Sequence, residues 1–294
     1  MIALRTHLEL GRVSNLPTVW TNVLAAAVLS DAPLAPGPTL AVLAALSAFY
    51  VAGMYLNDAM DATLDAVERP GRPIPSGRAS VEEVTAWAVR LFVAGAVLLA
   101  AARATAPGSA GSGDAAWLLA GALLVGTIVL YDRAHKGNPY GPLLMGACRV
   151  LVYAVAALVL AGRLPLAVAG GAALVLAWLI GLTFAAKREG LGRVDELWPL
   201  ALLALPLAAG LAAAVREPLV WLPLAALAGA AALAARRMRR GRGDDVRRAV
   251  GLMIAAISLV DAVLVARGGD LGWTSLAMLG FVATLVLHRV VRGT

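Results

Sequence analysis

The chain of 294 residues is 61% hydrophobic, has only 15% charged residues and has a mean hydropathy of +0.81. Soluble domains are about half apolar and about a quarter charged, so this composition excludes an ordinary soluble, disordered or nucleic-acid-binding protein. The net charge of +7 therefore bears on membrane topology, because cytoplasmic loops collect arginine. The single cysteine, Cys148, excludes an intrachain disulfide.

Apolar segments with the length of membrane-spanning helices follow one another along the whole chain. A transmembrane helix needs about 20 mainly apolar residues, and ten segments meet or approach this requirement: 16–30, 39–56, 84–102, 115–131, 142–161, 165–186, 197–214, 218–235, 249–266 and 271–288. We expect an all-α, polytopic transmembrane bundle of nine or ten spans, forming a single domain over residues 1–294. Glu9 and the lack of an unbroken apolar run before Asn15 are not typical of a cleaved signal peptide.

Arginine and lysine are distributed unequally between the two sets of loops. With the N-terminus inside, most basic residues fall in inside segments, of which the richest is RRMRRGRGDDVRR at 236–248. The outside loops hold only Arg103, Arg163, Arg216 and Arg267. This asymmetry predicts a cytoplasmic N-terminus. We expect an integral protein of a bacterial inner membrane, with its active-site loops on the cytoplasmic side.

The loop after the second predicted span has three aspartates at helical spacing. It reads NDAMDATLDAVERPGRPIPSG over residues 57–77, and a helix that continues through Asp65 places Asp58, Asp61 and Asp65 on one stripe. Like charges at this spacing repel each other, and the C-terminal end of a helix disfavours anions. Such a cluster needs a cation. Mg²⁺ fits, because it is usually held by one or two carboxylates together with substrate phosphates.

The basic half of the same loop allows two interpretations. Its prolines end the helix and hold Arg69 and Arg72 near the carboxylates. In one interpretation the segment binds a metal and a phosphorylated substrate. In the other it is a polar loop whose aspartates and arginines pair with one another. The spacing of the aspartates and the rigid basic tail favour the first interpretation.

The run at 57–77 resembles the first aspartate-rich motif of the UbiA superfamily of intramembrane prenyltransferases, N-D-x-x-D-x-x-x-D followed by a variant of R-P-I-P-S-G. Two further elements are similar to the family pattern. They are RVSNLP at 12–17 together with Asn22, and YDRAHK at 131–136, which is one residue longer than the usual Y-x-x-x-K. The resemblance implies a helical bundle that transfers an isoprenoid group from a prenyl diphosphate to an acceptor, with Mg²⁺ as cofactor.

The resemblance, together with the departures from it and the charges inside spans that are described below, suggests roles for individual residues. The metal ligands would be Asn57, Asp58, Asp61 and Asp65. The substrate and diphosphate ligands would be Asn22, Arg72, Tyr131, Lys136, Lys187 and Arg188. Catalysis would involve Asp58, Asp61, Arg149 and Glu189, with Arg149, Glu189 and Asn22 on the headgroup or acceptor side. The partners would be a prenyl diphosphate, an acceptor small molecule or lipid, and the bilayer, with no nucleic acid.

The chain departs from the family pattern after the sixth predicted span, where a second aspartate-rich motif is usual. Here it reads TFAAKRE at 183–189. We expect Lys187 and Arg188 to bind diphosphate in place of a second metal; the alternative is that they are ordinary basic residues of a cytoplasmic loop. Similar sequences occur in the branch that transfers phosphoribose to a polyprenyl phosphate, and MGACR at 145–149 resembles the UbiA-like member of the bacterial Ebo gene cluster. Both favour a polar, non-quinone acceptor.

Two charged residues lie inside predicted spans, where charge is costly and marks a functional candidate. Arg149 could instead reach back to the interface or pair with an aspartate, and Asp261 has no partner that the sequence reveals. Three functions are compatible with these features: prenyl transfer, glycosyl or phosphoribosyl transfer to a polyprenyl phosphate, and non-catalytic lipid binding or transport. The aspartate stripe followed by RPGRPIPSG favours prenyl transfer.

Overall fold

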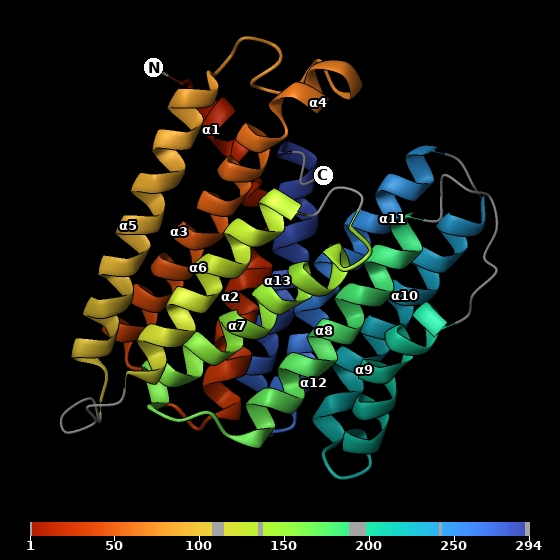
Figure 1. The fold of residues 1–294 in the computed structure, drawn as a ribbon. Helices are drawn as coiled ribbons and strands as arrows, with labels where there is room; N and C mark the ends of the chain where they lie inside the picture. The colour runs from red at the N-terminus through yellow and green to blue at the C-terminus, as the bar shows by residue number, and fades with distance from the viewer. Residues whose placement is uncertain (1, 108–114, 135–137, 188–197, 241–242, 292–294) are drawn as a thin grey trace.

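The computed structural model describes residues 2–107, 115–134, 138–187, 198–240 and 243–291, which form helices and connecting turns with no strand among them. Long helices run side by side to form a bundle (Figure 1), which confirms the predicted all-α class. In chain order the helices are α1 Leu4–Leu10, η1 Val13–Asn15, α2 Leu16–Leu29, α3 Pro36–Met60, α4 Ala62–Glu68, α5 Val81–Thr105, α6 Ala116–Ala134, α7 Gly141–Ala161, α8 Leu166–Lys187, α9 Trp198–Ala214, η3 Pro218–Val220, α10 Trp221–Arg240, α11 Gly243–Ala255, α12 Ile257–Ala266 and α13 Leu271–Val290.

The predicted spans correspond to these helices. Eight helical stretches are long and apolar enough to cross a membrane, and two shorter apolar stretches, Val13–Leu29 and Ala201–Ala214, match the first and seventh predicted spans. The ninth predicted span consists of α11 and α12, which meet at Ala256. The count of nine or ten spans stays a prediction, as does the side of the membrane on which the N-terminus lies.

Prolines and capping residues set several helix boundaries. Proline occupies the first turn of α2, α3 and α7, where its missing N–H would have no helical partner. At the start of α5 the Ser80 hydroxyl accepts a hydrogen bond from the Glu83 backbone N–H at 3.1 Å, and the Glu83 side chain accepts one from the Ser80 N–H. α7 ends at Ala161 and is followed by Gly162, whose φ of 67° suits glycine.

The core lies where α2 and α12 pack against each other. Every residue of α12 is buried, and α7, α8, α10 and α13 also contact this helix or α2. Outer helices expose large apolar side chains such as Val93, Leu119 and Leu279, as expected for surfaces that face lipid. Asn22 and Asp261 are fully buried in the core, so both side chains depend on protein partners for hydrogen bonds.

The aspartate-rich segment is not the continuous helix that the sequence predicted. α3 ends at Met60, Asp61 lies in a turn, and α4 begins at Ala62. Three neighbouring carboxylates repel one another and meet the negative end of the α3 dipole, which opposes a continuous helix. Backbone hydrogen bonds still cross the turn, from Asp61 N to Asn57 O and from Asp65 N to Asp61 O, each 2.9 Å long. The side chains of the three aspartates are all buried.

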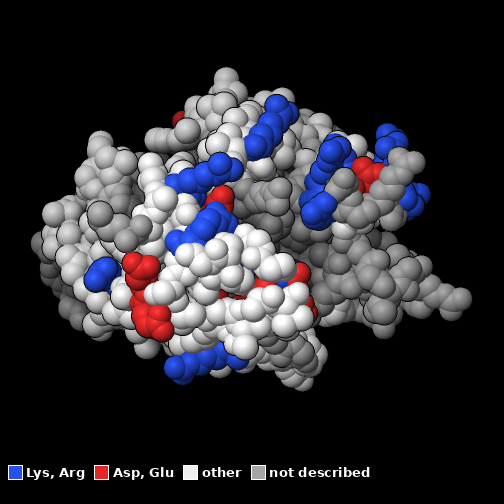
Figure 2. All heavy atoms as spheres, turned by 90° about the horizontal axis from the view of Figure 1, so that it is seen from above, with Lys and Arg blue, Asp and Glu red and all other residues white. Residues whose placement is uncertain are grey.

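α1, α4 and the C-terminal end of α13 lie at the same end of the bundle (Figure 1). Arginine side chains are spread across this end, with acidic side chains among them (Figure 2). At the opposite end Arg163 pairs with Asp31 at 3.0 Å. The α3–α4 segment is one of the basic segments that the sequence predicts to be cytoplasmic. The aspartate-rich motif therefore lies at the arginine-rich end of the bundle.

Gly95 allows α5 to approach α3 closely. A β-carbon at this position would lie 2.6 Å from Phe49 Cε1 and 3.0 Å from the Ala45 carbonyl oxygen, whereas a β-carbon at Gly126 of α6 would meet nothing within 4 Å. We therefore expect Gly95→Ala to lower the free energy of unfolding by about 1–3 kcal/mol, because the two helices must separate. The matched control Gly126→Ala should be neutral or slightly stabilising, because alanine favours the helix more than glycine does. Thermal unfolding in detergent measures both, and equal melting temperatures would contradict the close packing.

Candidate active site

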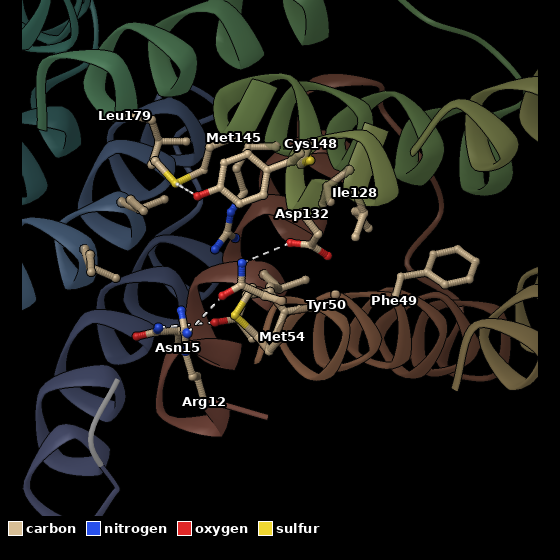
Figure 3. Close-up of a pocket in the computed structure, with 18 of the residues that line it drawn as sticks. Arg12, Asn15, Phe49, Tyr50, Met54, Ile128, Asp132, Met145, Cys148 and Leu179 are labelled. Carbon is tan, nitrogen blue, oxygen red and sulfur yellow. Dashed lines mark hydrogen bonds between the residues drawn. The ribbon is translucent and has the colours of Figure 1, made fainter. Parts of the chain in front are cut away.

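A cavity of about 410 Å³ opens among α2, α3, α6, α7, α8 and the α11–α12 span, a volume typical of small-molecule sites. Arg12 and Asn15 lie on the side of the cavity opposite Met145 and Cys148 (Figure 3). Apolar side chains form what we call the apolar chamber: Val19, Leu46, Phe49, Leu124, Ile128, Val152, Leu179, Leu182, Val250, Ile254 and Ile257. The charged residues of the wall are Arg12, Arg69, Arg72, Asp132 and Arg149.

Arg12 joins the N-terminal segment to the aspartate-rich motif. Its Nη2 donates to Asn57 Oδ1 at 3.2 Å and to Asp58 Oδ1 at 3.1 Å. Asn57 donates in turn from Nδ2 to Asp132 Oδ1 at 3.3 Å. Arg12 has a φ of 42°, a left-handed conformation that is unfavourable for a side-chain-bearing residue. The contacts of its guanidinium offset this cost and place a cation beside the carboxylates.

Arg72 bridges the two ends of the aspartate stripe. Its Nη1 lies 2.6 Å from Asp65 Oδ2 and 3.3 Å from Asp58 Oδ1. The structure therefore contains the pairing of aspartates with arginines that the second interpretation of this loop predicted. The same contacts show that the oxygens of Asp58 and Asp65 converge on a single positive charge. We call this group of Arg12, Arg72, Asn57, Asp58 and Asp65 the polar end of the cavity; Arg12, Asn57 and Arg72 line the cavity wall, and Asp58 and Asp65 do not line it but pair with its arginines.

The polar end fits a hard divalent cation. Mg²⁺ takes oxygen ligands and usually uses one or two carboxylates together with substrate phosphates, and Asp58 and Asp65 already share one cationic partner. Within the described ranges, no group of three or more acidic, histidine or cysteine side chains is placed to hold a metal ion. The structure therefore brings two carboxylates, Asp58 and Asp65, to one cation, Arg72, and the predicted metal site of Asn57, Asp58, Asp61 and Asp65 stays a prediction.

Tyr131 and Asp132 bring the end of α6 to the site, and both line the cavity. The Tyr131 hydroxyl contacts Met145 Sδ at 4.0 Å. Asp132 is 3% exposed and lies within electrostatic range of Asp58 and Asp61. A further carboxylate therefore stands next to the aspartate-rich motif.

Arg149 reaches from α7 into the cavity wall beside α2. Its Nη1 donates to Asn22 Oδ1 at 2.8 Å and its Nη2 to Thr18 Oγ1 at 3.0 Å. The guanidinium carbon lies 5.8 Å from the centroid of the Tyr50 ring, within the range of a cation–π contact. Asn22 is not part of the cavity wall, so it acts on the cavity through Arg149.

Asp261 on α12 has partners that its sequence position does not reveal. Its Oδ2 accepts hydrogen bonds from Thr21 Oγ1 at 2.6 Å and from Asn22 Nδ2 at 2.8 Å, and its Oδ1 accepts one from the Tyr153 hydroxyl. Three uncharged donors from α2 and α7 therefore satisfy the buried carboxylate, which would otherwise be costly in an apolar interior. The Asn22 amide lies between this carboxylate and Arg149.

The predicted cationic group at the end of α8 lies at or beyond the limits of the described structure. Lys136, Arg188 and Glu189 fall outside the described residues. Lys187 ends α8, but its side chain is outside the described part. The predicted contacts of these residues with diphosphate stay predictions. Thr183, one helical turn before Lys187, lines the cavity, so this end of α8 borders the site.

The polar residues of the cavity wall that were not predicted as ligands include Arg12, Asn15, Tyr50 and Asp132. Signals for them exist in the sequence. Arg12 and Asn15 belong to the RVSNLP segment, and Asp132 directly follows Tyr131. Tyr50 precedes Asp58 by eight residues on α3, a spacing that places both on one face of a helix.

Comparison with known proteins points to one family. The model of the UbiA prenyltransferase family matches residues 15–260. Digeranylgeranylglyceryl phosphate synthase of Ignicoccus hospitalis is 40% identical over 96 residues, which are 32% of this chain and 31% of that protein. The chain thus spans about a third of the length of the curated relatives that it matches.

Solved structures share the fold. The apo structure of a UbiA homolog from Aeropyrum pernix has a TM-score of 0.61 at 19% identity, and the match covers 86% of this chain and 96% of that chain. A UbiA homolog from Archaeoglobus fulgidus, solved with bound GPP and Mg²⁺, has a TM-score of 0.53 at 14% identity and covers 96% of this chain and 99% of that chain. At these identities the likeness establishes the fold.

Arg72 holds α4 against the end of α3. We expect Arg72→Gln to raise amide hydrogen exchange in residues 62–68 by about fivefold, because a contact contributing about 1 kcal/mol is lost. Arg69→Gln is the matched control, since Arg69 is exposed and forms no ion pair with any residue that the structure describes. Exchange measured by mass spectrometry checks this, and unchanged protection in Arg72→Gln would show that the ion pairs do not hold α4.

Proposed function

Because the chain belongs to the UbiA prenyltransferase family, we propose that it transfers an isoprenyl group from a prenyl diphosphate to an acceptor within the membrane. The cavity carries this proposal, because its charged polar end opens into an apolar chamber. A prenyl diphosphate has the same division, with an anionic head and an apolar chain. The head would lie at Arg12 and Arg72 beside Asp58, and the chain would lie in the apolar chamber.

The proposed reaction produces a negatively charged diphosphate and an allyl cation. One part of the cavity would stabilise the diphosphate, and the other would protect the cation. The bond between the allylic carbon and the diphosphate oxygen breaks, and the diphosphate leaves with the electron pair. The acceptor nucleophile then bonds to the allylic carbon and gives up its proton. Arg12 and Arg72 supply positive charge where the leaving group gains negative charge, and the apolar chamber keeps water away from the allyl cation.

We propose Mg²⁺ as the cofactor, held by Asp58, Asp61 and Asp65 together with Asn57. When bound, the metal would neutralise the charge of the departing diphosphate. Two observations support this: Asp58 and Asp65 converge on one cation, and the structural neighbour from Archaeoglobus fulgidus was solved with GPP and Mg²⁺. Lys187 and Arg188 would add positive charge at the end of α8.

The acceptor is proposed to be a polar, non-quinone molecule. The curated relatives are digeranylgeranylglyceryl phosphate synthases, whose name refers to a prenylated glyceryl phosphate. Within this chain, Arg149 places a cation in the cavity wall, and the basic TFAAKRE segment stands where acidic residues are usual in the family. Both features favour an acceptor that is polar.

The chain is an integral membrane protein, in keeping with its apolar helices and its family. We propose that residues 1–294 act as one domain, whose polar end faces the cytoplasm of a bacterial inner membrane. The arginine-rich segments favour this orientation. A water-soluble diphosphate head would then reach the polar end from the cytoplasm.

Asp58 and Asp61 should be required for activity. We expect Asp58→Asn and Asp61→Asn each to lower Mg²⁺-dependent transfer by at least about 100-fold, because each change removes a charged oxygen donor while keeping the size of the side chain. Turnover of a labelled prenyl diphosphate by purified protein measures the effect. Asp31→Asn is the control, since Asp31 pairs with Arg163 at the other end of the bundle. Undiminished transfer by both site variants would exclude the proposed metal site.

A comparison of donors separates prenyl transfer from the other functions considered. Membranes containing the protein are incubated with a prenyl diphosphate, or with phosphoribosyl diphosphate and a polyprenyl phosphate, and the lipid products are identified by mass spectrometry. We expect a product only from the prenyl diphosphate, with none in Asp58→Asn membranes. A product only from the sugar donor would establish phosphoribosyl transfer. Retained lipid without turnover from either donor would favour a lipid-binding or transport protein.

A further inference from the structure

Arg149 is a cavity cation that the proposed metal site does not use. It lies over the ring of Tyr50, and Tyr50 precedes Asp58 on α3 by eight residues, which is about 12 Å along a helix axis. Arg149 therefore lies about two helical turns deeper than the polar end, next to the apolar chamber. A charged group at this depth is expensive and needs a specific role.

The counter-charge for Arg149 is Asp261, and Asn22 connects the two. Asn22 presents its carbonyl oxygen to Arg149 and its amide nitrogen to Asp261, each at 2.8 Å. The partners fix the orientation of the amide, because a flipped amide would set N–H groups against a cation and an oxygen against an anion. Thr21 and Tyr153 hold the carboxylate on its other sides. The position of Arg149 is thus determined by Asn22 and Asp261, neither of which lines the cavity.

This arrangement leaves part of the guanidinium available to a ligand. A guanidinium has five N–H donors, and the hydrogen bonds of Arg149 to described residues go to Asn22 and Thr18. Neither partner is charged, and no described carboxylate lies within ion-pair distance of Arg149. The side chain lines the cavity. A planar guanidinium with unused donors is suited to bidentate binding of a carboxylate or a phosphate.

We propose that Arg149, positioned by Asn22 and Asp261, binds an acidic group of the acceptor, either a phosphate or a carboxylate, inside the cavity. This inference rests on the proposed prenyl transfer, and it assigns to Arg149 the selection of the acceptor in that reaction. The two anions of the reaction are then held apart, with the donor diphosphate at the polar end and the acid of the acceptor about two turns deeper. Arg149 contacts the acceptor, and Asn22 and Asp261 are positioning residues.

Binding of three matched probes, measured with saturating inorganic diphosphate and Mg²⁺ so that the polar end is already filled, tests this proposal without requiring turnover. Decyl phosphate, decanoate and decanol share one apolar chain and differ in the head group. We expect at least one of the two acids to bind the intact protein at least about tenfold more tightly than decanol, because charge-assisted hydrogen bonds contribute this much. The acid that binds more tightly identifies the group that Arg149 recognises. Arg149→Gln should remove the preference and leave decanol affinity unchanged.

Two further variants test the positioning. Arg149→Lys keeps the charge but loses the planar fork, so it should retain only part of the preference. The double variant Asn22→Asp with Asp261→Asn exchanges the two groups without changing the composition, and it places a carboxylate directly against Arg149. We expect this variant to stay folded, to lose the preference for acids, and to raise KM for an acidic acceptor while leaving KM for the prenyl diphosphate unchanged.

Arg72→Gln, at the polar end, is the matched control and should keep the preference for acids. A preference lost in Arg72→Gln and kept in Arg149→Gln would place the bound anion at the polar end and overturn the proposal. Equal loss of acid and decanol binding in an Arg149→Gln protein of unchanged melting temperature would also overturn it. If the acid preference depends on Arg149 but no donor is turned over, the prenyl-transfer function fails and the anion site stands.

Discussion

The carboxylate of Asp261 sets the strictest constraint on this bundle. A charged group away from water must have its hydrogen bonds made by protein, and losing one partner leaves a desolvated charge at high cost. Asp261 is fully buried and takes its donors from α2 and α7. The three helices therefore cannot slide or rotate independently. The same contacts fix Arg149 and hence the part of the cavity wall beside Tyr50.

The two charged regions of the cavity are built in different ways. At the polar end, Arg12 and Arg72 come from turns and reach carboxylates at the end of α3 and on α4, so the proposed metal or diphosphate would exchange with these pairs without moving the long helices. Deeper in the cavity, Arg149 and its partners all lie on helices of the core. This difference suits a polar end that exchanges ligands and an inner wall that holds one shape.

Hydropathy was sufficient to predict the helical class and the positions of the long apolar helices, and motif spacing was sufficient to predict that Asp58 and Asp65 lie close together. They could not identify the partners of Asp261, because Thr21 and Asn22 lie 240 and 239 residues away along the chain. Asp132 was missed because a charged residue at the end of an apolar segment resembles the start of a loop. The interruption at Asp61 was missed because periodicity describes which residues share a face and does not include the repulsion among them.

The orientation of the Asn22 amide also constrains how the sequence can diverge. An aspartate at position 22 would face both a cation and a carboxylate, so it is compatible with a fold of this kind only when position 261 is neutral. Loss of the arginine at 149 would remove the cation that the charge at 261 balances. Positions 22, 149 and 261 should therefore vary as a set among descendants of one ancestor, and a change at a single one of them should mark a lineage that has adopted a different acceptor.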